Sequence, residues 1–232
     1  MLSGRDPARL QQAIEQLQSP QRSLALPCDV GNPESLQSLW DGASSYFGRI
    51  DIWINNAGQN HPQGPLASLS PEQIGSVLTA NLTGLILASR VAVRGMLEQG
   101  AGSLYNMEGL GSDGRRIAGT LVYSTTKHAV RYFTEGLIAE LRGTPVRVGT
   151  LSPGMVLTDL LLQGQDQAGS ASRRRIFSLL ADRVETVTPF LVREILRDPG
   201  HGARIAWLTN RKIFWRLATA PLSRRKLPGD GG

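Results

Sequence analysis

Short apolar runs alternate along the chain with longer segments whose apolar residues recur at helical spacing. In the first such segment, Leu10, Ala13, Ile14 and Leu17 share one helical face. The pattern predicts helices over residues 7–17, 32–47, 70–99 and 121–142. It predicts strands over residues 22–30, 49–58, 102–108, 146–154 and 203–209. Strands and helices therefore follow one another in regular alternation.

Three of the predicted helices begin with a polar residue followed by proline: Asp6-Pro7, Asn32-Pro33 and Ser70-Pro71. The polar side chain can cap free N–H groups, and proline fits the first helical turn. Apolar strands joined by helices and short connections predict a parallel sheet covered on both faces. The expected fold is α/β, a doubly wound parallel sheet of the Rossmann type in a single domain.

Length and composition fit one large domain, since the chain has 232 residues, 41% of them hydrophobic and 19% charged. We expect this domain to span residues 1–209 and a basic, aromatic tail to span residues 210–232. A single cysteine, Cys28, excludes an internal disulfide and favours a reducing, cytoplasmic compartment. No apolar stretch is predicted to approach the roughly 20 residues that span a bilayer.

The net charge is +6 and the pI is about 10.1. Such a surplus could bind nucleic acid, an anionic membrane or a phosphorylated cofactor, and it could equally form a solvated basic surface. The basic residues fall in no recognisable nucleic-acid-binding module, so we expect no nucleic-acid partner.

Tyr123 and Lys127 lie one helical turn apart in "YSTTK" and share one helix face. A free tyrosine has a pKa near 10, and a nearby ammonium lowers the pKa by favouring the phenolate. Tyr123 could then act as a general acid in the reduction of a carbonyl group. Taken alone, the spacing equally fits a solvated helix face.

Four further polar stretches accompany this pair in a fixed order along the chain. They are "CDV" (28–30), "NNAG" (55–58), "NLTG" (81–84) and "SPGMVLT" (152–158). With these motifs, the chain resembles the short-chain dehydrogenase/reductase family over nearly all of its length. The resemblance implies catalytic roles for Asn81, Tyr123, Lys127 and a serine.

The resemblance also implies a cofactor site. It places Asp29 and Val30 beside the adenine. It places Asn56, Ala57 and Gly58 along the cofactor. Lys127 would hold the nicotinamide ribose and assist Tyr123. The resemblance assigns the segment with Pro153, Gly154, Val156 and Thr158 to the carboxamide end. Arg5, with Ser3, follows the second strand of the family fold, where the ribose is recognised. Because a guanidinium suits a 2′-phosphate, NADP(H) is favoured over NAD(H).

One departure concerns the catalytic serine, which the family pattern places about thirteen residues before the tyrosine. That position is occupied by Leu110 in "NMEGLGSD", and the nearest hydroxyl is Ser112. Ser112 could polarise a carbonyl if the loop bends back, or it could cap a turn.

Residues 105–162, which include "NMEGLGSDGRR" and "LSPGMVLTDLLL", resemble the chlorophyll b reductase branch of the family. This resemblance implies hydride transfer from NADPH to the formyl group of a chlorin pigment, which becomes hydroxymethyl. Two alternatives stay open: a short-chain reductase of another bulky, apolar carbonyl compound, and a non-catalytic subunit of a full-length partner.

Apolar residues of the expected lid (158–200) suit a large, flat substrate, although core packing explains them equally well. The basic, aromatic tail could contact an anionic membrane surface, such as a photosynthetic membrane, or remain solvated. In this family, the helices that begin near Ser70 and Leu121 pair with a second copy, so we expect a homo-oligomer.

The second departure lies at the start. The family fold opens with a strand and a glycine-rich turn whose following helix binds pyrophosphate. Neither is present here, so we expect an N-terminally truncated domain that binds NADPH weakly or not at all. We also expect strand 22–30 to be separated from strand 49–58 by a gap of two strands, about 10 Å.

Overall fold

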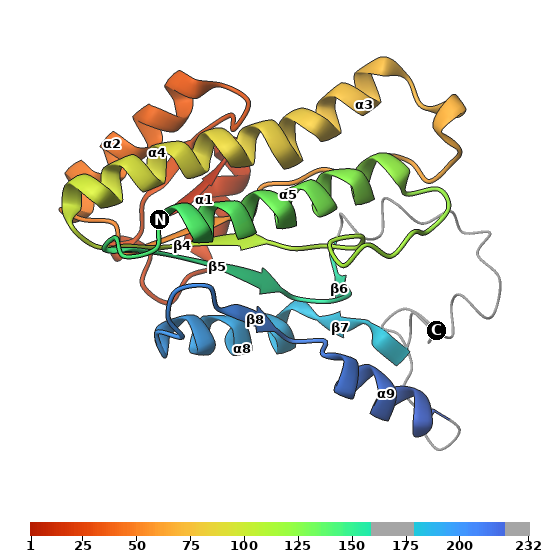
Figure 1. The fold of residues 1–232 in the computed structure, drawn as a ribbon. Helices are drawn as coiled ribbons and strands as arrows, with labels where there is room; N and C mark the ends of the chain where they lie inside the picture. Colours follow the sequence, from red (N-terminus) through yellow and green to blue (C-terminus); the bar gives the residue numbers. More distant parts are fainter. Residues whose placement is uncertain (159–178, 221–232) are drawn as a thin grey trace.

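A four-stranded parallel sheet lies at the centre of the molecule (Figure 1). Its strand order is β3 (Ile52–Asn55), β4 (Gly102–Met107), β5 (Val146–Ser152) and β8 (Arg204–Ala206). The computed structural model describes residues 1–158 and 179–220. Helices cover both faces of the sheet, which confirms the predicted doubly wound α/β class.

Two hydrophobic cores lie on opposite faces of the sheet. The larger one joins the sheet to helices α2 (Pro33–Phe47), α4 (Gly84–Gln99) and α5 (Leu121–Glu140). The smaller one joins the sheet to α8 (Val184–Leu196) through Val187, Leu191 and Ile195. This part of the expected lid therefore packs as a core helix, while residues 159–178 lie outside the described part of the chain.

The capping signals in the sequence are confirmed. The Asp6 carboxylate accepts from Ala8 N and Arg9 N at the start of α1 (Pro7–Glu15). Asn32 caps α2, and Ser70 forms a capping box with Gln73 at the start of α3 (Pro71–Leu78). Phe47, the last residue of α2, is exposed.

A separate pair of parallel strands holds the N-terminal end of the chain. Strand β1 (Leu2–Gly4) pairs with β2 (Ala25–Pro27), and within the described residues neither is hydrogen-bonded to the larger sheet. The expected separation of β2 from β3 is confirmed. Because β1 remains paired with β2, however, the break lies between β1 and β3.

The open edge strand β3 is less buried than its sequence predicted. Trp53 and Asn55 are buried, but Ile52 and Ile54 on the other face are 39% and 42% exposed. Successive side chains of a strand point to opposite faces, so one face of β3 lacks a covering layer among the described residues.

The long helix predicted over residues 70–99 consists of α3, a π-helical segment η3 (Thr79–Thr83) and α4. By length and composition, the run Pro71–Gln99 could cross a membrane, since an 18-residue window within it has a mean hydropathy of 1.5. This corrects the expectation that no apolar stretch is long enough to span a bilayer. Core helices of globular proteins pass the same test, and here 44% of the apolar window is buried inside the fold.

The remaining described elements are short. They comprise η1 (Pro20–Arg22), η2 (Leu66–Ser68), the parallel two-residue strands β6 (Val156–Leu157) and β7 (Asp182–Arg183), and the C-terminal helix α9 (Asn210–Ala218).

Candidate active site

Tyr123 and Lys127 lie in the first two turns of α5, where one helical turn brings them onto the same face. Lys127 Nζ is 5.8 Å from the centroid of the Tyr123 ring. The same ammonium donates to Met107 O at the end of β4, at 3.2 Å. The helix therefore holds both side chains at the carboxyl end of the sheet, where ligands bind in open α/β folds.

Burial dominates the protonation of both groups. It raises the pKa of Tyr123 to about 12 and lowers the pKa of Lys127 to about 8. The expectation that Lys127 lowers the tyrosine pKa is therefore not met in this structure, because desolvation of the phenolate dominates.

Asn81 is fully enclosed in the π-helical segment and joins three parts of the site. Its Oδ1 accepts from Gln59 N at 2.6 Å, and its Nδ2 donates to Gln59 O at 2.9 Å. Nδ2 also donates to Thr126 Oγ1 on α5, at 3.1 Å. π-Helical turns occur frequently at functional sites, and this one fixes the loop after β3 against the helix of Tyr123.

Two glycines allow close approach to these side chains. A Cβ atom on Gly109 would lie 2.6 Å from Tyr123 Oη and 3.0 Å from Lys127 Cε. A Cβ atom on Gly58 would lie 3.3 Å from Asn81 Oδ1 and 3.9 Å from Lys127 Nζ. The closeness of Gly109 to Tyr123 could not be recognised from the sequence, in which Gly109 belonged only to the segment of the displaced serine.

Ser112 is buried in the loop between β4 and α5. Its Oγ accepts from Gly109 N at 3.0 Å and donates to the Lys127 carbonyl oxygen at 3.2 Å. The hydroxyl thus ties the loop after β4 to α5, in keeping with the turn-capping alternative. A role in polarising a carbonyl group stays a prediction.

A buried polar chain supports the strand ends beneath the site. Asn55 Nδ2 donates to Asn106 Oδ1 at 2.8 Å, and Asn106 Nδ2 donates to Thr134 Oγ1 at 2.9 Å. Asn55 Nδ2 also donates to Ser89 Oγ on α4. The chain connects β3, β4, α4 and α5, so the last residue of the apolar "IWIN" strand has a structural role.

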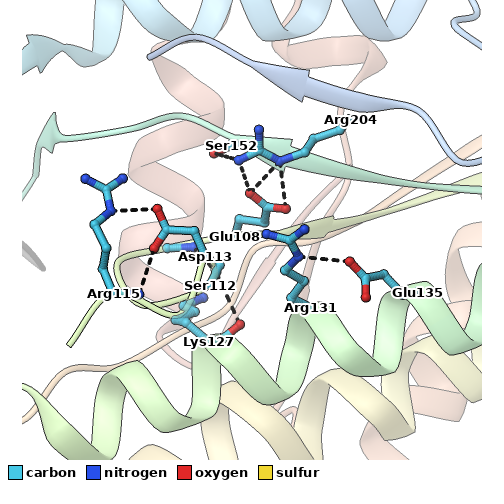
Figure 2. Close-up of polar contacts among 10 residues, drawn as sticks. Glu108, Ser112, Asp113, Arg115, Lys127, Arg131, Glu135, Ser152 and Arg204 are labelled. Carbon is cyan, nitrogen blue, oxygen red and sulfur yellow. Dashed lines mark hydrogen bonds and ion pairs between the residues drawn. The ribbon is translucent and has the colours of Figure 1, made fainter. Parts of the chain in front are cut away.

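An ion pair that no sequence pattern indicated joins the ends of the strands (Figure 2). Glu108, which follows β4, is buried and accepts from Arg204 Nη2 at 2.7 Å and from Arg204 Nε at 3.0 Å. Arg204 also donates to Ser152 Oγ, and Glu108 raises the pKa of the guanidinium. The pair fastens β4, β5 and β8 together.

His61 is a further residue without a sequence signal. It is buried, and its Nε2 accepts from the backbone N of Tyr123 at 3.3 Å. Its Nδ1 lies 2.7 Å from Pro62 O, so the consistent tautomer carries the proton on Nδ1. The imidazole therefore caps the first turn of α5 beside Tyr123.

The residues assigned to the carboxamide end follow β5 in a tight turn. Pro153 precedes Gly154, which has a positive φ of 76°, and a Cβ atom on Gly154 would lie 2.4 Å from Leu208 Cβ. Val156 then lies in β6, and Thr158 Oγ1 donates to Val156 O.

The residues assigned to the adenine end follow β2. The Asp29 carboxylate accepts from Gly31 N at 2.9 Å, and Val30 packs so closely on α4 that a Cβ atom on Gly84 would lie 2.7 Å from Val30 Cγ2. Asn56 and Ala57 are exposed directly after β3.

Ser3 and Arg5 are exposed at the end of β1. With the Gln59 amide oriented to face the guanidinium, its oxygen accepts from Arg5 Nη2 at 2.8 Å. Arg5, at the end of β1, therefore contacts the loop that follows β3. Asp6 is engaged in capping α1, as expected.

The Tyr123 side of the site fits a nicotinamide nucleotide, because two glycines leave a cradle that a Cβ atom would fill and Lys127 lies within it. The β1 side offers Arg5. Among the described residues, no glycine-rich turn leads into a helix between β1 and β3.

A doubly wound parallel sheet with polar side chains gathered at its carboxyl edge is the architecture of nucleotide-binding α/β proteins. A family model described as short chain dehydrogenase matches residues 1–168. The chain belongs to this family of oxidoreductases.

Among its curated relatives, "Probable chlorophyll(ide) b reductase NYC1, chloroplastic" from Oryza sativa subsp. japonica is 41% identical over 198 residues, covering 85% of this chain and 38% of the relative. "Chlorophyll(ide) b reductase NOL, chloroplastic" from Arabidopsis thaliana is 34% identical, covering 97% and 68%. The chain thus spans about two fifths of the length of the first relative and about two thirds of the second.

Solved structures are similar in fold. A serine dehydrogenase in complex with NADP+ matches with a TM-score of 0.61 at 30% identity, over 66% of this chain and 61% of that chain. A 3-ketoacyl-(acyl-carrier-protein) reductase from Brucella melitensis in complex with NADH matches with a TM-score of 0.76 at 21% identity, over 90% and 86%. The second likeness shows the fold alone.

Proposed function

We propose that the chain is an NADPH-dependent short-chain reductase that converts the formyl group of a chlorophyll b-type pigment into a hydroxymethyl group. The observation that carries the proposal is the convergence of Tyr123, Lys127 and Asn81 at the carboxyl edge of the sheet. The identities of 34–41% to relatives named chlorophyll(ide) b reductases support the choice of substrate.

In this proposal, Tyr123 donates its phenolic proton to the carbonyl oxygen as negative charge develops there. A pKa of about 12 keeps the proton on Tyr123 at neutral pH, and a pKa of about 8 keeps Lys127 charged. The ammonium favours the phenolate that remains after proton transfer. Bound NADPH would supply the hydride.

The other residues position these groups. Asn81 holds the loop after β3 against α5, and Gly58 and Gly109 keep the space beside Lys127 free of side chains. Asn56, Ala57, Asp29, Val30 and the turn from Pro153 to Thr158 would line the cofactor. Ser112 would help to polarise the carbonyl group after a change in its loop.

The preference for NADPH over NADH is supported by Arg5. Its guanidinium lies at the carboxyl end of β1, where a charge-assisted contact with a 2′-phosphate is chemically favourable.

We also propose that the protein pairs with a second copy. A groove with exposed apolar side chains, among them Ile86, Leu121 and Tyr132, runs along α4 and α5. An apolar patch of this kind on a solvent-exposed protein surface is typical of an interaction site.

The test is an assay of the full chain at saturating NADPH with a chlorophyll b-type pigment and, in parallel, a panel of small ketones. We expect conversion of the formyl group, and a loss of about a hundredfold or more in rate for Tyr123→Phe. Turnover of small ketones alone would support the general short-chain reductase. Absence of turnover together with a stable complex with a full-length relative would support the non-catalytic subunit.

A further inference from the structure

The C-terminal helix α9 contacts the rest of the molecule through its charged side chains. Arg216 Nη1 donates to Asp182 Oδ2 at 2.8 Å, and Nη2 donates to Asp182 Oδ1 at 3.1 Å. Lys212 Nζ lies 3.0 Å from the centroid of the Trp207 ring, and Trp207 Nε1 donates to the same carboxylate. Asp182 is buried, so the inner side of α9 is held by an ion pair, hydrogen bonds and a cation–π contact.

Three large apolar side chains of α9 face outward, while Ile213 is half-buried. Phe214 is 66% exposed, Trp215 is 57% exposed and Leu217 is 47% exposed, and no residue of the helix is buried. A surface helix of a globular protein normally turns its apolar stripe toward the core. In α9 most of the large apolar side chains face away from the core instead, and we call Phe214, Trp215 and Leu217 the aromatic face of α9.

The chemistry of this face matches a lipid surface. Aromatic side chains are favoured at the membrane–water interface, and basic residues beside them attract anionic headgroups. The helix sequence "NRKIFWRLA" contains no acidic residue. Of its three basic residues, Lys212 and Arg216 make the inner contacts described above, and Arg211 is exposed. In the sequence, Arg224, Arg225 and Lys226 follow.

We infer that the aromatic face of α9 binds the surface of a membrane that contains anionic lipids. Phe214, Trp215 and Leu217 would enter the boundary between headgroups and acyl chains, while Arg211 contacts the phosphates. This inference goes beyond the proposed function and does not depend on it.

The size of the face favours lipid over a second protein chain. A stable protein interface buries about 1,200–2,000 Å² in total. A nine-residue helix with three exposed apolar side chains is small for that purpose, whereas a few inserted side chains with nearby positive charge suffice for reversible lipid binding.

Lipid binding would also orient the active site. Asp182, which holds α9, lies in β7 and pairs with Val156 in β6, the strand that follows the Pro153–Gly154 turn (Figure 1). Any substrate that partitions into the membrane would then approach from the side on which β6 and β7 lie.

The test measures co-sedimentation of the full chain with vesicles rich in phosphatidylglycerol and with vesicles of phosphatidylcholine alone, without pigment or cofactor. We expect binding to the anionic vesicles and a blue shift of tryptophan emission. The variant Phe214→Ser/Trp215→Ser should lose the shift and bind at least about tenfold more weakly.

The matched control is Tyr46→Ser/Phe47→Ser, which removes another exposed aromatic pair, at the end of α2. It should bind like the unmodified chain, and circular dichroism should show the same fold for all variants. Equal binding by the Phe214/Trp215 variant, no binding of the unmodified chain, or equal binding to both vesicle types would overturn the inference. A variant that changes only the oligomeric state would assign the face to a second copy instead. Because neither pigment nor cofactor is present, a failed reductase activity cannot produce these results.

Discussion

Tyr123 and Lys127 are both shifted toward their neutral forms by the same burial. The pKa of Lys127 falls to about 8 and the pKa of Tyr123 rises to about 12, in each case because the charged form is desolvated. At neutral pH, the burial of the charged Lys127 therefore lowers the free energy of unfolding. We interpret this loss of stability as the consequence of placing an ammonium next to the phenol.

The first prediction concerns stability against pH. Between pH 8 and about 10, the unfolded chain holds the Lys127 proton more tightly than the folded chain, so the free energy of unfolding should rise with pH. The full contribution is on the order of 3 kcal/mol. Denaturant unfolding across this range should show the rise in the unmodified chain and its loss in Lys127→Met.

Tyr123→Phe is the control, because it should keep the rise below pH 10. Above pH 10, Tyr123 contributes in the opposite sense, since the unfolded phenol ionises first. A Lys127→Met variant with the same pH dependence as the unmodified chain would contradict the account.

The second prediction concerns Gly109. An alanine there would place its Cβ atom 2.6 Å from Tyr123 Oη and force the phenol to move. Displacement of a reacting group by about 1 Å can cost on the order of a hundredfold in rate, so kcat should fall by roughly tenfold to a hundredfold. The control is Gly136→Ala on α5, the helix that carries Tyr123. A Cβ atom at Gly136 would meet nothing within 4 Å, so this variant should keep full activity. Equal rates for the two variants would show that Gly109 does not set the position of Tyr123.

At the scale of elements, the site depends on how β3, β4 and α5 are joined. Asn106 accepts from Asn55 and donates to Thr134, and it has no exposed surface. Buried polar groups stabilise a fold only when their hydrogen bonds are complete.

The third prediction is that Asn106→Ala lowers the free energy of unfolding by about 1–3 kcal/mol, because it leaves buried partners without a hydrogen bond. Gln37→Ala, which removes an exposed amide contact to Asp41 on α2, should change the value by less than about 0.5 kcal/mol. Thermal or denaturant unfolding of the two variants gives the comparison. Similar losses in both would mean that the buried chain adds no stability.

The sequence predicted those elements whose signals are local. The Asp6-Pro7, Asn32-Pro33 and Ser70-Pro71 starts are visible because a cap and the helix it begins are neighbours in the chain. The strands β6 and β7 are two residues long and carry no periodicity, so no sequence pattern could define them.

The site shows the same division. Tyr123, Lys127 and Asn81 belong to short motifs, but Glu108 and Arg204 are 96 residues apart and meet only through the pairing of β4, β5 and β8. His61 reaches Tyr123 across 62 residues. The expected effect of Lys127 on the tyrosine pKa was wrong because burial, which depends on the whole fold, outweighs a neighbouring charge.

For the molecule as a whole, the separation of β1–β2 from the larger sheet is the feature that bears on cofactor binding. Arg5, which follows β1, contacts Gln59, which follows β3. Ile52 and Ile54 of β3 are exposed. Weak binding of NADPH by the 232-residue chain stays a prediction.

The fourth prediction concerns cofactor preference. Arg5→Ser should lower kcat/KM with NADPH by about tenfold and leave the value with NADH nearly unchanged, because only NADPH carries the 2′-phosphate. Arg9→Ser, which removes an exposed guanidinium on α1, should alter neither. An unchanged ratio of the two values in Arg5→Ser would assign the preference to other residues.

The most direct test of the central claim is to follow the hydrogen itself. The full chain is incubated with a chlorophyll b-type pigment and NADPH deuterated at the transferred position, and the product is analysed by mass spectrometry. We predict a hydroxymethyl product with one deuterium on the former formyl carbon, and roughly a hundredfold less of this product with Tyr123→Phe. A product without deuterium, or no product from a chain shown by fluorescence titration to hold the cofactor, would contradict the claim.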